Sequence, residues 1–258
     1  MQTAQDFFLS LLPEATEISK DVSQRYFKKP LDQIGIQHKA DASPVTAADI
    51  EIESRLRSLI EKKFPDHGIV GEESGNTKSD ADFVWVLDPI DGTKSFISGV
   101  PLFTTLIALL HKGNPECGAI YQPILNELVW GNNRECFFNG NKTQIRNTAV
   151  LKDATLLITD ANDMTTHHPT AQFSKLTAQT RFWRTWADGY GYALLATGYA
   201  DVMLDPVMNP WDIMAVIPVV RGAGGIVSDF AGNDAAKGTS LMAAPPALHH
   251  QVKNILFS

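Results

Sequence analysis

Cysteine, excess positive charge and long apolar runs are all missing from this chain of 258 residues. It has two cysteines, Cys117 and Cys136, without C-x-x-C spacing, so neither a disulfide framework nor a zinc site is expected. A formal net charge of −7 lacks the basic footprint of a general nucleic-acid binder. No apolar run approaches the roughly 18 residues of a membrane span, and no basic segment with an apolar core marks a leader. We therefore expect a cytoplasmic protein that binds neither nucleic acid nor membrane.

The composition is that of an ordinary globule, with 44% hydrophobic and 20% charged residues. Short apolar runs between residues 106 and 138, separated by turn residues, predict an antiparallel meander. After a turn-rich stretch near residue 145, strands alternate with helices, which predicts a mixed or parallel sheet flanked by helices. We therefore predict an α/β protein with an α+β half at residues 1–145 and an α/β half at residues 146–258.

Two local predictions concern individual residues. Apolar residues at helical spacing between positions 7 and 22 predict a helix that Pro13 kinks or divides. The adjacent pairs His167-His168 and His249-His250 point apart on any regular element, so we expect surface residues rather than metal ligands.

The most informative stretch follows an apolar run that predicts a buried strand. The run ends in Asp88, Pro89 and a second acid, Asp91. Pro89 cannot donate to a sheet ladder, so the strand is predicted to stop there. Gly92 lets a phosphate approach the backbone, and Thr93 can cap a helix whose first N–H groups face an anion. Because α/β proteins gather ligands at the carboxyl ends of strands, this stretch is the candidate site.

Two acids this close repel each other. At about 4 Å and an effective dielectric near 20, like charges cost roughly 4 kcal/mol. Protonation of one acid, or a cation between them, removes that cost. An all-oxygen set beside an anion cradle favours Mg²⁺ held for phosphate chemistry. Two residues separate Asp88 from Asp91, whereas phosphatases that form an aspartyl-phosphate have one, so a metal-activated water is favoured over an Asp nucleophile. A plain Asp-Pro turn with a Thr cap remains the alternative.

Three further acids have structural explanations when taken singly. Asp49 follows Thr46 at the spacing of a capping box. Glu72 and its neighbour Glu73 lie between glycines, which is typical either of a ligand-bearing turn or of a solvated one. Asp212 lies in the first turn of a predicted helix, where an acid is favourable to the helix dipole.

Together and in this order, these motifs resemble the inositol monophosphatase superfamily of Mg²⁺-dependent, lithium-sensitive phosphomonoesterases over nearly the whole chain: Asp49 after Val-Thr-Ala-Ala, Gly-Glu72-Glu-Ser, Asp88-Pro-Ile-Asp91-Gly-Thr93, and Trp-Asp212 ahead of Gly-Gly. The resemblance implies a layered αβαβα fold, usually a homodimer, with two or three Mg²⁺ per site. It implies that Glu72, Asp88 and the carbonyl of Ile90 hold one metal. Asp88, Asp91 and Asp212 would hold the second.

The resemblance also implies how the phosphate and the water are held. The backbone N–H groups of Gly92 and Thr93 would bind the phosphate beside Asp91. Asp49 and Thr93, together with Glu72, would orient and deprotonate the attacking water. In such a family one metal lowers the pKa of that water and another stabilises the leaving alkoxide, without a covalent intermediate.

Two segments are similar to the histidinol-phosphatase branch of the superfamily. One is the run Thr93-Lys-Ser-Phe-Ile-Ser-Gly-Val-Pro-Leu-Phe, and the other is the segment from Arg184 to Asp188, where this chain has Trp-Ala-Asp in place of the commoner Gly-Gly-Asp. Histidinol phosphate carries an amine and an imidazole that accept protons, so its pocket should offer acids. Asp188 and Asp205 are the candidates, and Arg184 is a third candidate for substrate binding.

The sequence therefore favours a phosphatase that hydrolyses L-histidinol phosphate to L-histidinol in histidine biosynthesis. The enzymatic alternative is an inositol-1-phosphate or broad sugar-phosphate phosphatase that uses the same residues. The non-enzymatic alternative is a catalytically silent dimer with a regulatory or binding role.

Overall fold

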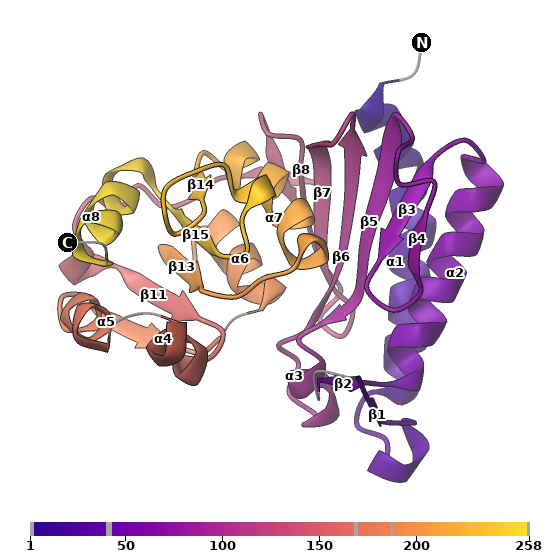
Figure 1. Cartoon of the computed structure of the whole chain (residues 1–258), viewed down its shortest axis with the longest axis horizontal. Helices are drawn as coiled ribbons and strands as arrows, with labels where there is room; N and C mark the ends of the chain where they lie inside the picture. Colours follow the sequence, from indigo (N-terminus) through magenta and orange to yellow (C-terminus); the bar gives the residue numbers. More distant parts are fainter. Residues whose placement is uncertain (1–2, 40–42, 168–169, 187, 257–258) are drawn as a thin grey trace.

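The computed structural model describes residues 3–39, 43–167, 170–186 and 188–256. Its elements form five layers in the order helix, sheet, helix, sheet, helix, which confirms the predicted αβαβα fold (Figure 1). The helices are α1 (Ala4–Tyr26), α2 (Ala47–Lys63), α3 (Thr93–Ile97), α4 (Ala161–His167), α5 (Thr170–Thr177), α6 (Gly189–Ala196), α7 (Pro210–Gly222) and α8 (Pro246–Leu256), with short 3-10 helices η1 (Leu31–Gln33), η2 (Leu151–Asp153) and η3 (Ala235–Lys237).

The first sheet has eight strands in the order β10-β9-β8-β7-β6-β5-β3-β4. The strands are β3 (Gly68–Gly71), β4 (Gly75–Thr77), β5 (Phe83–Asp91), β6 (Thr104–His111), β7 (Asn114–Gln122), β8 (Glu127–Gly131), β9 (Cys136–Phe138) and β10 (Asn141–Thr143). From β6 to β9 each strand pairs antiparallel with the next, which confirms the predicted meander. Strands β5 and β10 extend the antiparallel order at its two ends, whereas β3 runs parallel to β5.

The second sheet is mixed and has five strands in the order β12-β11-β13-β15-β14. The strands are β11 (Thr155–Ile158), β12 (Phe182–Arg184), β13 (Val202–Asp205), β14 (Ile226–Ser228) and β15 (Leu241–Ala244). Strand β11 is parallel to β12 and β13, and β15 is antiparallel to β13 and β14. The predicted division at residue 145 lies where the chain crosses from β10 to β11, and it stays a prediction. A separate pair, β1 (Gln37–His38) with β2 (Pro44–Val45), precedes α2.

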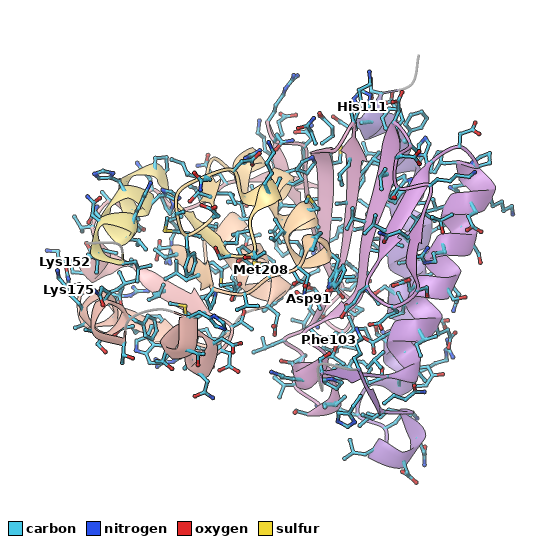
Figure 2. All side chains as sticks on the ribbon, in the orientation of Figure 1. Asp91, Phe103, His111, Lys152, Lys175 and Met208 are labelled. Carbon is cyan, nitrogen blue, oxygen red and sulfur yellow. The ribbon has the colours of Figure 1, made fainter. Side chains whose placement is uncertain are left out.

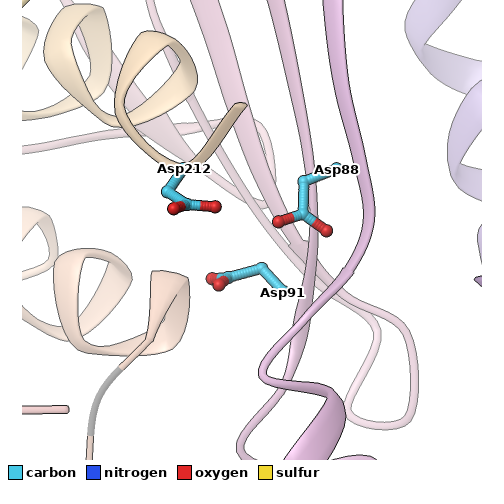
Figure 3. A group of neighbouring side chains, drawn as sticks. All are labelled: Asp88, Asp91 and Asp212. Atoms are coloured by element: carbon cyan, nitrogen blue, oxygen red, sulfur yellow. The ribbon is translucent and has the colours of Figure 1, made fainter. Parts of the chain in front are cut away.

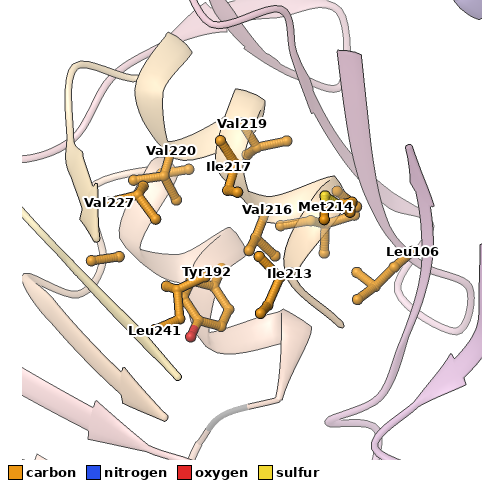
Figure 4. Packing of buried hydrophobic residues seen from close by; sticks show 14 of the residues in the cluster. Leu106, Tyr192, Ile213, Met214, Val216, Ile217, Val219, Val220, Val227 and Leu241 are labelled. Carbon is orange, nitrogen blue, oxygen red and sulfur yellow. The ribbon is translucent and has the colours of Figure 1, made fainter. Parts of the chain in front are cut away.

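Apolar residues fill each space between the layers. Because successive side chains of a strand point to opposite faces, Trp85 and Leu87 of β5 pack toward α1 and α2, while Val84 and Val86 pack toward α7. Helix α7 is apolar around most of its circumference because it lies between the two sheets (Figure 4). The outer helices α5 and α8 cover the far face of the second sheet. In the ranges that the structure describes, none of the helices is both long and apolar enough to cross a membrane.

Two local predictions need correction. Pro13 does not divide helix α1, because this proline lies on the exposed face, where water can bind the carbonyl that it leaves without a helical partner; a kink at Pro13 stays a prediction. His249 is 9% exposed, and its Nε2 lies 2.9 Å from Ser228 Oγ, so it is a buried, hydrogen-bonded residue rather than a surface one. His250 is exposed as expected, and His168 lies outside the described residues.

Candidate active site

A β-bulge at the end of β5 brings two acids to one side of the strand. Strand β5 does not stop at Pro89: Asp88 pairs with Leu106 and Asp91 with Thr104, so one extra residue lies on the β5 side. On a regular strand, residues three apart point to opposite faces. The bulge cancels that alternation, and both carboxylates enter one cluster. Asp91 lies where the two sheets meet (Figure 2).

Asp212 completes this cluster from the other half of the chain. It lies in the first turn of α7, and its Oδ2 accepts a hydrogen bond from the Asn209 N–H at 2.7 Å. The predicted place of Asp212 in the first helical turn is therefore confirmed, and its capping contact with Asn209 coexists with a second role. One oxygen from each of Asp88, Asp91 and Asp212 lies within 4.8 Å of the others (Figure 3).

The electrostatics of the cluster indicate a cation site. Burial, followed by repulsion from neighbouring carboxylates, raises the pKa of Asp88 and of Asp91 well above the ordinary value. Burial likewise raises the pKa of Asp212 to about 6. Asp88 is 2% exposed, and its Oδ1 accepts no hydrogen bond from the described residues. An unpartnered buried oxygen among three carboxylates fits Mg²⁺, because a divalent ion would both bind that oxygen and reverse the repulsion.

Glu72 also lines this cleft, where its carboxylate forms an ion pair with Lys39. The Lys39 Nζ is 2.6 Å from Glu72 Oε1 and 2.8 Å from Glu73 Oε1. Burial opposes the charged form of Lys39, but these two hydrogen bonds outweigh it and raise the lysine pKa above its usual value. The sequence analysis missed Lys39, because a single lysine in a loop carries no motif. Glu72 is not part of the three-acid cluster, so its assignment as a metal ligand stays a prediction.

Buried Glu53 determines the shape of the turn that carries Glu72. Its carboxylate accepts hydrogen bonds from the N–H groups of Glu73 and Ser74, each at 2.8 Å, and from Arg57 Nε at 2.8 Å. Glu53 is 0% exposed. A fully partnered acid therefore supports the turn from α2, while the acid that the turn displays points toward the cleft.

The anion cradle begins at Gly92 rather than at Thr93. Gly92 is the N-cap of α3 with a φ of +90°, and an added Cβ would lie 2.9 Å from Asp188 Oδ2, so only glycine fits here. Thr93 is the first helical residue, and its hydroxyl donates to the carbonyl of Ile90 at 3.0 Å. Predicting Thr93 as the cap was wrong, although both N–H groups remain at the cleft, which these two residues and Ile90 line.

Asp49 lies deeper than predicted. It is 0% exposed, and its Oδ2 accepts hydrogen bonds from the Thr46 N–H at 2.8 Å and the Thr46 hydroxyl at 2.5 Å, which confirms the capping box. Burial raises the pKa of Asp49 to about 7, and its Oδ1 has no partner among the described residues. Asp49 is not among the residues that line the cleft, so its catalytic role stays a prediction.

The cleft of about 390 Å³ adjoins an acidic side pocket of about 70 Å³, and Asp91 and Asp212 line both. The predicted substrate residues Asp188 and Asp205 line the side pocket. Burial raises the pKa of Asp188 to about 7 and that of Asp205 to about 6. Asp188 also has a φ of +52°, a strained value of the kind that clusters at functional sites.

Further polar groups shape the side pocket, and the sequence analysis missed them. Asp160 and Asp163 line it, and the hydroxyl of Tyr192 donates to Asp205 Oδ2 at 2.7 Å. Arg184 is not among the lining residues. It is exposed, with its guanidinium 5.3 Å from the ring of Phe182, so its role in substrate binding stays a prediction. Ala187, at the departure from the branch pattern, lies outside the described residues.

The model of the inositol monophosphatase family matches residues 6–256. The chain belongs to this family. It is 40% identical over 233 residues to the chloroplastic bifunctional phosphatase IMPL2 of Arabidopsis thaliana, covering 89% of this chain and 66% of the relative. It is 36% identical to a histidinol-phosphatase of Chlorobaculum parvum, covering 90% and 92%. The structure of an inositol monophosphatase from Zymomonas mobilis superposes with a TM-score of 0.86 at 32% identity, covering 99% of both chains.

Family membership and the acid cluster agree on the chemistry. This inositol monophosphatase family member is a metal-dependent phosphomonoesterase, and Asp88, Asp91 and Asp212 form an acidic cluster that could hold its metal. Bound Mg²⁺ would supply the positive charge that neutralises a phosphate dianion and activates water.

Proposed function

We propose that this chain hydrolyses L-histidinol phosphate to L-histidinol and phosphate, a step of histidine biosynthesis. The observation that carries the proposal is the acidic side pocket, which shares Asp91 and Asp212 with the metal site. With the phosphate against Gly92 and Thr93, the leaving alcohol would lie in this pocket. A cationic amine and imidazolium there would favour the ionised forms of Asp188 and Asp205 and bind to them.

The chain's own residues would divide the reaction between them. The N–H groups of Gly92 and Thr93 bind phosphate oxygens at the amino end of α3. Asp49 and Thr93 would help to orient the attacking water, and the Asp49 carboxylate would accept its proton, a role that suits its pKa of about 7. The carboxylates of Glu72, Asp88, Asp91 and Asp212 and the carbonyl of Ile90 would hold two or three Mg²⁺.

The similarity to a histidinol-phosphatase and to a bifunctional phosphatase supports this substrate. The similarity to the Zymomonas mobilis enzyme supports the alternative, an inositol-1-phosphate or sugar-phosphate phosphatase. The side pocket favours the first, because six acids line it and a neutral polyol needs hydroxyl partners as much as charge.

The decisive experiment compares kcat/KM for histidinol phosphate and inositol-1-phosphate side by side, with Mg²⁺ and with EDTA. We expect histidinol phosphate to be preferred by at least about tenfold, roughly 1.4 kcal/mol of discrimination. A tenfold preference for inositol-1-phosphate would overturn the proposal. Absence of phosphate release from any ester with Mg²⁺ would favour the silent regulatory dimer.

We further propose that the enzyme is a lithium-sensitive, cytoplasmic homodimer. Sedimentation velocity should give twice the mass of the chain, and Li⁺ should inhibit the Mg²⁺-supported reaction. A monomer at micromolar concentration, or turnover that Li⁺ leaves unchanged, would refute the corresponding part.

A further inference from the structure

The bulge that aligns Asp88 and Asp91 needs support of its own. Between these two acids, Pro89 and Ile90 lie opposite a single residue of β6, Thr105. A bulge interrupts the ladder, and a buried carbonyl that loses its ladder partner needs another donor. For Ile90 the donor is the Thr93 hydroxyl at 3.0 Å, and for Pro89 it is the Thr105 hydroxyl at 2.7 Å.

A second hydroxyl, that of Ser19, forms a hydrogen bond with the Thr105 hydroxyl. Ser19 Oγ of α1 lies 2.6 Å from Thr105 Oγ1, and the two side chains are 0% and 1% exposed. The carbonyl of Pro89 can only accept, so Thr105 donates to it and must accept from Ser19. The protons therefore have one arrangement: Ser19 donates to Thr105, and Thr105 donates to Pro89. These two buried hydrogen bonds connect helix α1 to the bulge of β5 through Thr105 of β6.

The neighbouring residue acts on the opposite face. Consecutive strand residues point to opposite sides of a sheet, so Thr104 points toward α6 while Thr105 points toward α1. The Thr104 hydroxyl lies 3.4 Å from Asp91 Oδ2, which also accepts the N–H of Gly189. One oxygen of Asp91 is thereby held by the protein.

We propose that Thr105, supported by Ser19, is a positioning residue of the metal site. By holding the carbonyl of Pro89, it keeps the bulge in the conformation that directs Asp88 and Asp91 to the same side. Without this bond the peptide of Pro89 can rotate, and the two carboxylates lose their common direction. The inference rests on the metal-dependent chemistry of the site and is independent of which phosphate ester is the substrate.

Direct metal binding tests this role without relying on turnover. Mn²⁺ binding by the purified enzyme, measured by electron paramagnetic resonance, is compared for Thr105→Val, Thr105→Ser and Ser19→Ala, together with the Mg²⁺ concentration for half-maximal activity. Loss of a group that orients a metal ligand typically costs about 10- to 100-fold in affinity. We expect Thr105→Val to weaken Mn²⁺ binding at least about tenfold, Ser19→Ala to weaken it less, and Thr105→Ser to restore it.

The matched control is Thr155→Val in the second sheet. Thr155 is also buried, at 2% exposed, and its hydroxyl accepts from Arg181 Nη2 at 3.0 Å, so the same atoms change at a site away from the cleft. Both valine variants should lower the melting temperature, but only Thr105→Val should weaken Mn²⁺ binding. If Thr105→Val does not fold, the Mn²⁺ affinity of Ser19→Ala becomes the test of the positioning role. An unchanged affinity in that variant overturns the proposal.

Two other outcomes are equally clear. Mn²⁺ affinity of Thr105→Val within twofold of the wild type overturns the positioning role, as does an equal loss in Thr155→Val. A wild-type enzyme that binds no Mn²⁺ would refute the metal site itself, which distinguishes failure of the site from failure of this inference.

Discussion

Strand β13 has a buried acid beside each end, and the two have opposite surroundings. Asp201, just before the strand, is 0% exposed and fully partnered: its carboxylate accepts hydrogen bonds from Arg146 Nη2 at 2.5 Å, Thr148 Oγ1 at 2.6 Å and the Thr155 N–H at 2.7 Å. Asp205, at the other end, lines a pocket that five further acids share.

The same contrast is strongest between Asp201 and the acids of the metal cluster. Asp88 is buried like Asp201, but one of its oxygens has no partner among the described residues, and two carboxylates face it where Asp201 has an arginine. A buried charge that the chain neutralises itself contributes to stability, and one left for a ligand contributes to function. The variants below test that division, beginning with the largest expected effect.

Asp91→Asn should reduce kcat by about 10²- to 10³-fold, the usual consequence of losing one preorganised charge in a reacting site. The metal-free protein should melt no lower than the wild type, because the change removes one of several repelling charges. Phosphate release and thermal melting in EDTA measure the two effects. Asp153→Asn, the same substitution at an exposed position, is the control. Near-normal turnover in folded Asp91→Asn would contradict the metal scheme.

Asp201→Asn should have the reverse effect. The substitution removes the charge of buried Asp201, which Arg146 and Thr148 bind, although the Arg146 side chain is 35% exposed. Loss of a hydrogen bond to a charged group typically lowers the free energy of unfolding by about 1.5–3 kcal/mol. Urea unfolding measures this loss, while kcat/KM of the folded fraction should stay within about twofold of the wild type. If turnover fell as far as in Asp91→Asn, the separation of structural from functional acids would be wrong.

Asp188→Asn should separate the substrate pocket from the metal site. We expect KM for histidinol phosphate to rise about tenfold, equivalent to about 1.4 kcal/mol, because the variant loses a charge that faces the cationic alcohol. KM for an ester with an uncharged alcohol, such as p-nitrophenyl phosphate, should change less. Equal changes for both esters would show that Asp188 acts on the phosphate rather than on the leaving group.

His249 gives the smallest effect, and it concerns stability alone. Burial, with help from Lys253 and His250, lowers the pKa of His249 below its usual 6.5, so the folded state favours the neutral ring. This stabilisation is therefore present above pH 6.5 and is lost as the pH falls below it, by at most about 1.4 kcal/mol per pH unit. Urea unfolding between pH 5 and 8 measures the slope. His249→Gln should flatten it, and an unchanged slope would assign the dependence to another group.

Local chemistry made much of the site predictable. Thr46 with Asp49 forms the predicted capping box, Asp88 and Asp91 end the predicted buried strand, and Asp212 lies in the first helical turn. The errors share one cause. Pro13 was expected to kink or divide its helix and Pro89 to end its strand, but the first faces solvent and the second lies in a bulge that Thr105 supports. Local propensity gives way where tertiary contacts supply the missing partner.

The sequence by itself determined which acids exist, their spacing and the family pattern that they match. It also determined the alternation of apolar residues that produces two sheets with helices between them, because side-chain periodicity is a local property. Only the tertiary structure decided that Asp88 and Asp91 face the same side, that Lys39 pairs with Glu72, and that Asp160 and Asp163 join the side pocket. The physical reason is that direction, burial and electrostatic coupling arise between segments far apart in the chain, where sequence spacing carries no information about distance.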